Sequence, residues 1–224
     1  MSSPATAKPT AARFVATTLE LIEEEGGSLT VNLRQISRRM GCAHTNVYNY
    51  FSSYQDLLWE AFRRGLDLYG EYLIHDLSTQ LAPTEYLRRV ITNLVSFPQQ
   101  RPGLYRLIGS DPIDISAIPA DILEYVTGMK EWLAKAFLAA GGPGLTEEEA
   151  TQACNIVLAY IDGETLNLIN GREIPDENLR GRVIANAARL VTLLTANTES
   201  DGERRSPPDP QMVFSKRSER KDRR

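Results

Sequence analysis

The chain has 224 residues, of which 42% are hydrophobic and 24% charged, and its formal net charge is −4 at pH 7. This balance is ordinary for a soluble globular protein, and it excludes bulk electrostatic attraction as the basis of any binding to nucleic acid. No apolar run is long enough to span a bilayer, and the N-terminal residues lack the apolar core of a secretion signal. We therefore expect a cytoplasmic protein without a membrane partner.

Charge is distributed unevenly along the chain. Residues 1–70 carry seven Lys or Arg and seven Asp or Glu, residues 71–198 carry ten and sixteen, and residues 199–224 carry eight and six. The middle of the chain is therefore acidic, and its ends are relatively basic. A DNA site would have to depend on local basic side chains such as Arg34, Arg38 and Arg39.

The N-terminal part predicts an arm followed by a helix. Residues 1–9 are rich in Ser, Ala, Thr and Pro and predict a mobile arm. A helix is expected over residues 10–25 because apolar side chains recur on one face, and Gly26 and Gly27 end it. The three glutamates at 23–25 oppose the helix macrodipole there, so we expect them to face solvent. The face expected to be buried carries Phe14, Thr18, Leu21 and Ile22.

Residues 33–56 predict a helix-turn-helix. A short helix over 33–40 begins at Asn32, which with Gln35 three residues later matches a capping box. Gly41 suits the tight turn, because a residue without a Cβ readily adopts a positive φ. A second short helix is expected over 44–51, with Val47 and Phe51 facing inward. The side chains left on its outer surface, which can meet base edges and phosphates in a major groove, are His44, Thr45, Asn46, Tyr48 and Asn49.

These residues carry a resemblance to a known family. The runs 34–37, 40–42 and 47–51, followed by Ser53 and the pair Leu57-Leu58, make residues 10–60 similar to the DNA-binding domain of the tetracycline-repressor (TetR) family. Two positions depart from the family pattern. Ala43 replaces a capping Ser, and Tyr54 replaces a Lys that often reaches a phosphate. The resemblance implies DNA contacts by Arg34, His44, Thr45, Asn46, Tyr48, Asn49, Tyr50 and Tyr54. The alternative is an ordinary corner of a helical bundle with core aromatic residues.

The rest of the chain also predicts helices, and because no segment alternates with period two, we expect an all-α fold. Proline and glycine set most of the breaks, with Thr84, Thr146 and Asp176 as expected N-caps and Pro98 as an expected helix end. The expected helices span residues 54–81, 85–97, 102–108, 119–140, 147–170 and 177–197, and a loop spans 109–119. We assign residues 10–55 to the DNA-binding domain, 56–197 to a regulatory and dimerisation domain, and 198–224 to a disordered charged tail.

The family resemblance also implies a homodimer formed through the last two long helices, an unknown small-molecule effector and double-stranded DNA as partner. Apolar or small stripes on those helices include Ile156, Gly163, Val183 and Ala187, although either stripe can instead be monomer core. A ligand pocket would be lined by aromatic groups and one carboxylate, for which core packing is the competing interpretation. The pocket candidates are Phe97, Tyr105, Tyr125, Trp132, Tyr160 and Asp162.

The function predicted from the sequence is a ligand-responsive DNA-binding transcriptional regulator, and we expect a repressor. An enzyme is the competing class. Neither histidine, His44 or His75, lies in a recognised pattern with a nucleophile, and the sequence contains no glycine-rich phosphate loop and no metal-ligand spacing, so we predict no cofactor and no metal. A third hypothesis is a DNA-binding regulator controlled by a protein partner or by no effector.

Overall fold

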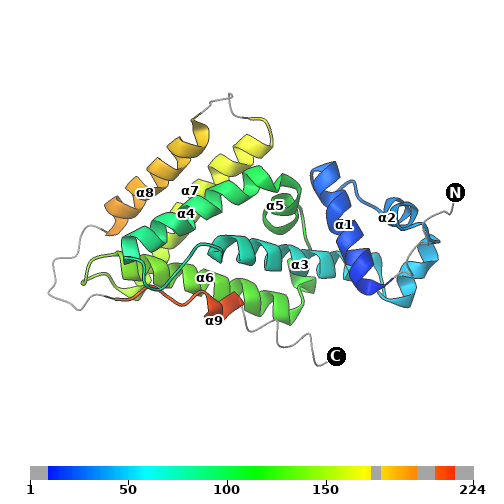
Figure 1. Ribbon diagram of the computed structural model, residues 1–224, viewed down its shortest axis with the longest axis horizontal. Helices are drawn as coiled ribbons and strands as arrows, with labels where there is room; N and C mark the ends of the chain where they lie inside the picture. The colour runs from blue at the N-terminus through cyan, green and yellow to red at the C-terminus, as the bar shows by residue number, and fades with distance from the viewer. Residues whose placement is uncertain (1–9, 173–177, 196–204, 215–224) are drawn as a thin grey trace. The chain divides into compact units, whose positions relative to one another are not determined.

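The structure is a computed structural model that describes residues 10–172, 178–195 and 205–214. Every regular element in these ranges is a helix, which confirms the prediction of an all-α fold (Figure 1). None of the described helices combines the length and the apolar character that a membrane crossing requires. The elements in chain order are α1 (Ala11–Glu25), α2 (Leu33–Met40), η1 (His44–Asn49), α3 (Tyr54–Ile74), α4 (Pro83–Gln100), α5 (Pro102–Gly109), η2 (Ile115–Ala117), α6 (Ala120–Ala140), α7 (Glu147–Ile169), α8 (Leu179–Thr195) and α9 (Gln211–Phe214).

The described residues form two compact units. Unit 1 contains the residues up to Leu68 and those of Arg101–Pro119, and unit 2 contains Tyr69–Gln100 and the residues from Ala120 onward. The division falls inside α3, so the helix contributes to both units. It also places α5 in the unit that contains α1 and α2. The functional boundaries expected after residues 9, 55 and 197 remain predictions.

Local sequence signals set the ends of the first two helices. Gly26, with φ 73°, ends α1, and Gly41, with φ 68°, ends α2; both lie in the left-handed region that favours glycine. The capping box of Asn32 and Gln35 is present at the start of α2, as predicted. The predicted inner face of α1 is confirmed. Its buried members include Phe14, Thr18, Leu21 and Ile22.

At the acidic end of α1, Glu24 and Glu25 are exposed, as predicted, whereas Glu23 is half-buried. Each of the three carboxylates accepts a hydrogen bond from another element of unit 1. A negative charge at a helix C-terminus is unfavourable, and these donors compensate for it. The donors are Arg101 for Glu23, Arg39 for Glu24 and Gln35 for Glu25.

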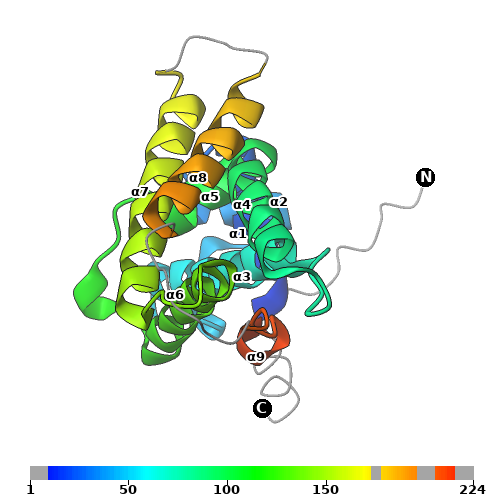
Figure 2. The ribbon, with the colours of Figure 1, turned by 90° about the vertical axis from the view of Figure 1, so that its left-hand side faces the viewer.

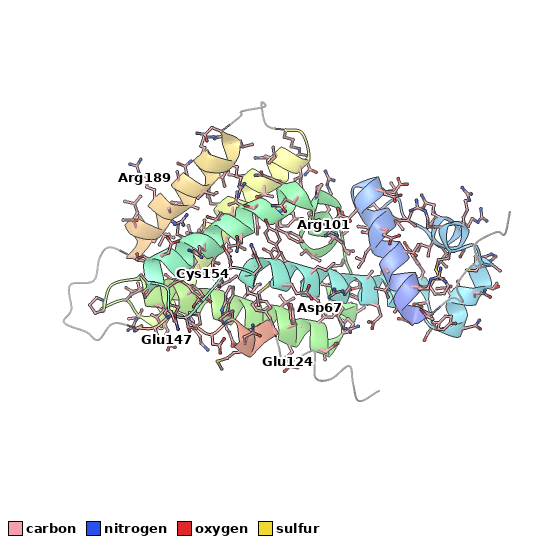
Figure 3. All side chains as sticks on the ribbon, viewed as in Figure 1. Asp67, Arg101, Glu124, Glu147, Cys154 and Arg189 are labelled. Atoms are coloured by element: carbon pink, nitrogen blue, oxygen red, sulfur yellow. The ribbon has the colours of Figure 1, made fainter. Side chains whose placement is uncertain are left out.

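Unit 2 is a bundle in which α7 and α8 lie side by side with α4 against both, and α6 packs on α4 and α7 (Figure 2). The predicted capping box of Thr146 and Glu149 starts α7. Cys154 lies buried in α7 (Figure 3), where burial raises the pKa of its thiol to about 12. It therefore acts as a small core side chain. Asp176, the cap predicted for the last helix, lies outside the described residues.

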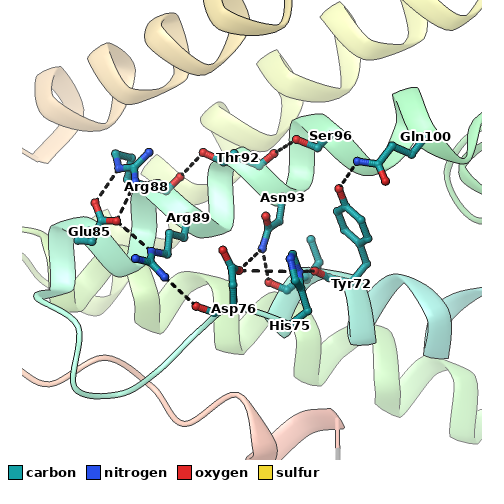
Figure 4. A network of polar contacts seen from close by, with 11 residues as sticks. Tyr72, His75, Asp76, Glu85, Arg88, Arg89, Thr92, Asn93, Ser96 and Gln100 are labelled. Atoms are coloured by element: carbon teal, nitrogen blue, oxygen red, sulfur yellow. Dashed lines mark hydrogen bonds and ion pairs between the residues drawn. The ribbon is translucent and has the colours of Figure 1, made fainter.

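The third helix is shorter than predicted, ending at Ile74 and not at residue 81. Side chains form hydrogen bonds with the backbone carbonyl groups at the end of this helix (Figure 4). Asn93 Nδ2 of α4 donates to Leu73 O at 3.0 Å and to Asp76 Oδ1 at 2.9 Å, and His75 Nδ1 lies 2.7 Å from Tyr72 O. Because these partners satisfy the last carbonyl groups, the backbone can leave the helix there.

The fourth helix is longer than predicted at both ends. Pro83 starts it in place of the expected cap at Thr84, and Pro98 lies inside it. A proline at the first helical position is favourable, because the N–H it lacks has no partner there anyway. Pro98 does remove one intrahelical hydrogen bond. The helix continues because the preceding Phe97 is buried against the rings of Tyr69 and Tyr72, at centroid distances of 4.9 and 5.3 Å.

The C-terminal part also differs from the prediction of a disordered tail. Residues 205–214, which we call the C-terminal strap, pack on unit 2 and end in α9. Pro207 and Pro210 are buried, and the carbonyl oxygen of Pro208 accepts a hydrogen bond from the Tyr86 hydroxyl at 2.9 Å. Its prolines prevent helix before residue 211, and the buried rings of Pro207 and Pro210 add apolar contact with unit 2. The remaining tail residues lie outside the described ranges.

Candidate nucleic-acid interface

The helix-turn-helix in unit 1 begins with α2, which is anchored by one apolar face. Ile36 and Met40 are buried, and the helix packs on α1 and η1. After Gly41, the amide of Cys42 donates to Ser37 O at 3.0 Å, which closes the turn. Cys42 itself is half-buried. The turn fixes where the following segment starts relative to α2.

The second short helix, predicted over 44–51, is a 3₁₀ helix that spans His44–Asn49. Its hydrogen bonds span three residues, as in Asn46 N to Ala43 O at 3.0 Å. Ala43 makes no side-chain cap, which is the consequence expected from the missing serine. Val47 is fully buried and Phe51 nearly so, which confirms the predicted inward face. These two side chains fix the segment on the core of unit 1.

The outer face of η1 is open to solvent. His44, Thr45 and Asn49 are exposed, and Tyr48 is 53% exposed. Asn46 is half-buried. Hydroxyl, amide, imidazole and phenol groups therefore share one accessible surface, which carries both donors and acceptors of hydrogen bonds. Such a surface can form hydrogen bonds to base edges and to phosphate oxygens.

The two remaining tyrosines of the predicted interface have different environments. Tyr50 is 44% exposed, and its ring lies 5.7 Å from that of Phe14. Tyr54 is half-buried, and its hydroxyl donates to Val31 O at 2.6 Å. Burial raises the pKa of Tyr54 to about 12. Because a hydroxyl has one proton, contact between Tyr54 and a phosphate would require the hydrogen bond to Val31 to break, so its geometry favours a structural role.

The basic side chains of α2 are not equivalent. Arg39 forms a two-pronged ion pair with Glu24, at 2.8 and 2.6 Å, and this hydrogen bond lowers the pKa of the Glu24 carboxyl. The guanidinium of Arg39 is thus directed to α1. Arg34 and Arg38 are exposed, at the start and in the last turn of α2. Arg39 is exposed as well, but Arg34 and Arg38 have no ion pair to α1 and can meet an anionic backbone directly.

Sequence reasoning missed the contribution of α5, which belongs to unit 1 and packs on α1. Gly103 N donates to Glu23 Oε2 at 3.1 Å, and Arg106 donates to the carbonyl oxygen of Gly26. Just after α5, Asp111 Oδ2 accepts from both the amide and the hydroxyl of Ser28 at 2.6 Å. These contacts hold the α1 end and the loop that leads to α2. The glycine and charges are visible in the sequence, but their partners are about 80 residues away.

The six pocket candidates are divided between the two units. Tyr105 lies in unit 1, while the others lie in unit 2. Tyr125 and Trp132 share a cluster on α6, and Phe97 packs on α3 rings. Tyr160 of α7 accepts a hydrogen bond from Asn186 at 3.0 Å. Asp162 reaches solvent, and its charge adds to the effect of burial in raising the pKa of Tyr69.

The described residues contain no group of three or more His, Cys, Asp or Glu side chains that could hold a metal ion. The histidine near the interface, His44, is exposed, and His75 belongs to the network at the end of α3 (Figure 4). The helix-turn-helix of unit 1 thus combines a tight turn, an exposed polar and aromatic face, and exposed arginines on α2.

Neither a scan against protein-family models nor a search of curated proteins finds a match. Among solved structures, the chain is similar to a transcriptional regulator from Rhodococcus sp. RHA1, with a TM-score of 0.67 and 16% identity over 83% of this chain and 97% of that chain. It is also similar to a TetR variant from Acinetobacter baumannii AYE in complex with minocycline, with a TM-score of 0.61 and 14% identity over 86% and 100% of the two chains. The fatty acid degradation regulator FadR from Bacillus halodurans gives a TM-score of 0.61 and 14% identity over 87% and 98%. At these identities the similarity establishes the fold.

Proposed function

We propose that this chain, which has the fold of the TetR-family regulators, is itself a regulator of transcription that binds double-stranded DNA. The observation that carries the proposal is the outer face of η1, which holds exposed Thr45, Tyr48 and Asn49 on a segment fixed by buried Val47. A short helix anchored in this way presents its side chains to a major groove without first having to order itself.

The exposed arginines of α2 support the same surface. Arg34 and Arg38 lie on the helix that precedes the turn, which in a helix-turn-helix crosses the DNA backbone. Phosphate contacts of this kind position a protein on DNA, and base contacts from the second helix select the sequence. Arg39 is paired with Glu24, so a phosphate would have to compete with that exposed ion pair for its guanidinium.

We further propose a homodimer formed through α7 and α8. Ile156 on α7 is 48% exposed and Leu193 on α8 is 64% exposed, and a Cβ added to Gly163 would have no neighbour within 4 Å. Val183 and Ala187, expected in the same stripe, are buried in the monomer core and do not belong to that face. Two copies would place two η1 segments about one helical turn of DNA apart, about 34–36 Å, which predicts a nearly palindromic operator.

Ligand control and repression complete the proposal. The fold of the TetR variant solved with minocycline is similar to that of this chain, which supports a small-molecule effector. An effector that favours one arrangement of the DNA-binding heads needs a coupling free energy of only about 1–3 kcal/mol to change operator occupancy. A thermal-shift screen of small molecules separates this hypothesis from control by a protein partner or by no effector.

The test uses duplexes selected from a random pool with the parent protein at low salt. Replacing Tyr48 by Ala should weaken binding to the selected duplex by about 5- to 150-fold, which corresponds to about 1–3 kcal/mol for a base-contacting side chain. The control is Leu29→Ala, because Leu29 is 71% exposed in the same unit but lies outside the helix-turn-helix. Both variants should keep the parent melting temperature. Equal affinity of the Tyr48→Ala variant and the parent protein would show that η1 is not the DNA-binding segment.

A further inference from the structure

The C-terminal strap covers a cluster of aromatic side chains in unit 2. The ring of Phe214 lies 5.3 Å from that of Trp132 and 6.0 Å from that of Tyr125, and both pairs have the edge-to-face geometry favoured by aromatic rings. Trp132 in turn lies 6.3 Å from Tyr86. Tyr86 comes from α4 and the other two from α6, so two helices and the strap build one aromatic site.

A glycine makes room for the Phe214 ring. A Cβ added to Gly70 of α3 would lie 2.5 and 2.7 Å from two atoms of that ring and would also touch the Tyr125 hydroxyl. Carbon atoms that do not share a bond pack at about 3.5–4.0 Å, so the ring and a larger side chain at residue 70 cannot both occupy this space. Nearby Gly128 of α6 differs, because its added Cβ would meet Val213 at an ordinary 3.7 Å.

The two ends of the strap are held differently. Near its start, Arg205 donates to Leu145 O at 3.0 Å, and Pro207 and Pro210 are buried. At its other end, Met212 is 62% exposed and Phe214 is half-buried. The aromatic site is therefore filled by the less buried end of a segment that is attached at its other end. A segment of this kind can release its last residues while the proline anchor stays bound.

We propose that the site formed by Gly70, Tyr125 and Trp132 binds a small planar aromatic molecule, and that Phe214 occupies this site as an internal competitor. Both occupants would use the same edge-to-face contacts with the α6 rings. The ligand must displace a tethered ring, so its apparent dissociation constant in the full chain is the intrinsic value divided by the fraction of molecules with an open site. This names the chemical class of the effector and rests on the proposed function.

The first experiment measures aromatic binding directly. The chain has two tryptophans, so a Trp59→Phe background leaves Trp132 as the fluorescent reporter. Benzyl alcohol serves as the probe. In this background Phe214→Ala should lower its dissociation constant at least about tenfold, because the site no longer has to open. Met212→Ala is the control, since it shortens an exposed neighbour. Equal affinity in the Phe214→Ala and parent proteins, or absence of binding in both, would overturn the proposal.

A second pair of variants tests the seating of Phe214 without any ligand. Gly70→Ala should expel the ring and change the Trp132 emission, whereas Gly128→Ala should leave the emission unchanged. If neither substitution changes it, Phe214 does not fill the site and the proposal fails. Circular dichroism spectra confirm that all variants are folded. None of these measurements uses DNA, so loss of operator binding in other experiments would refute the proposed function and leave this binding site standing.

Discussion

The contact between α5 and α1 makes a specific prediction about Gly103. A Cβ added there would lie 2.7 Å from Glu23 Cα and closer still to the carbonyl oxygen of Ile22. Both atoms belong to the α1 backbone, so no side-chain rotation relieves the clash. Because such atoms pack at about 3.5–4.0 Å, α5 must move away from α1 by about 1 Å.

The cost of Gly103→Ala follows from three effects. Overpacking by one methyl group costs about 1–3 kcal/mol. Displacement also weakens the hydrogen bond from Gly103 N to Glu23, which is 3.1 Å long and contributes about 1 kcal/mol. Alanine in place of glycine within a helix returns about 0.5–1 kcal/mol. The net loss is about 1–3 kcal/mol in the free energy of unfolding, or about 2–12 °C in melting temperature for a chain of this size.

The assay is urea and thermal unfolding of Gly103→Ala beside Gly109→Ala. Gly109 is the last residue of the same helix, and its added Cβ would meet the Tyr105 ring at an ordinary 3.7 Å. That control should match the parent protein or exceed it by about 1 kcal/mol. If Gly103→Ala were as stable as Gly109→Ala, the close approach of α5 to α1 would be wrong.

Two further predictions concern the proposed dimer and the half-buried hydroxyl group of Tyr54. Leu193→Glu places a charge on the apolar face proposed as the dimer interface, so it should shift the dimer towards monomer in sedimentation equilibrium. Met212→Glu, at a similarly exposed residue of α9, is the control and should leave the equilibrium unchanged. If the Leu193→Glu protein dimerised with the parent affinity, that face would be excluded as the interface. Tyr54 has its pKa raised from 10.0 to about 12, so the folded state holds its proton more tightly than the unfolded state does. The protonated Tyr54 hydroxyl therefore contributes fully to stability below pH 10, and this contribution falls as the pH rises towards 12. Phenylalanine does not titrate, so the urea midpoint of Tyr54→Phe should decline less than that of the parent protein between pH 10 and pH 12.

Helix ends that depend on neighbouring residues could be predicted from the sequence. The capping boxes at Asn32 and Thr146 and the left-handed Gly26 and Gly41 all appear where the pattern indicated. In each case the donor and acceptor lie within a few residues of each other, so a short window of sequence contains the whole interaction.

Elements whose ends depend on distant partners could not be predicted in the same way. The end of α3 depends on Asn93, about 20 residues later, and α4 continues through Pro98 because a buried Phe97 packs on α3. The strap was missed for a related reason. Its composition favours disorder, but Tyr86, 122 residues away, provides a hydrogen-bond donor for Pro208.

The candidate site shows the same division. Exposure of Tyr48 and burial of Val47 follow from helical spacing alone. The ion pair of Arg39 with Glu24 and the hydrogen bond of the Tyr54 hydroxyl with Val31 could be found only in the folded structure. Spacing therefore identified the face, but it could not tell which polar groups on or near that face already had partners.

The DNA-binding domain predicted over residues 10–55 is smaller than unit 1, because unit 1 also contains α5. A fragment ending at residue 55 would contain the whole helix-turn-helix but would leave Glu23, at the unfavourable end of the α1 dipole, without Arg101. It would also leave Ser28 without its acceptor, Asp111. The loop between α1 and α2 is thus held by residues that the sequence assigned to regulation. Any change that moves α5 must act on the geometry of α1, and through α1 on the segment that presents η1.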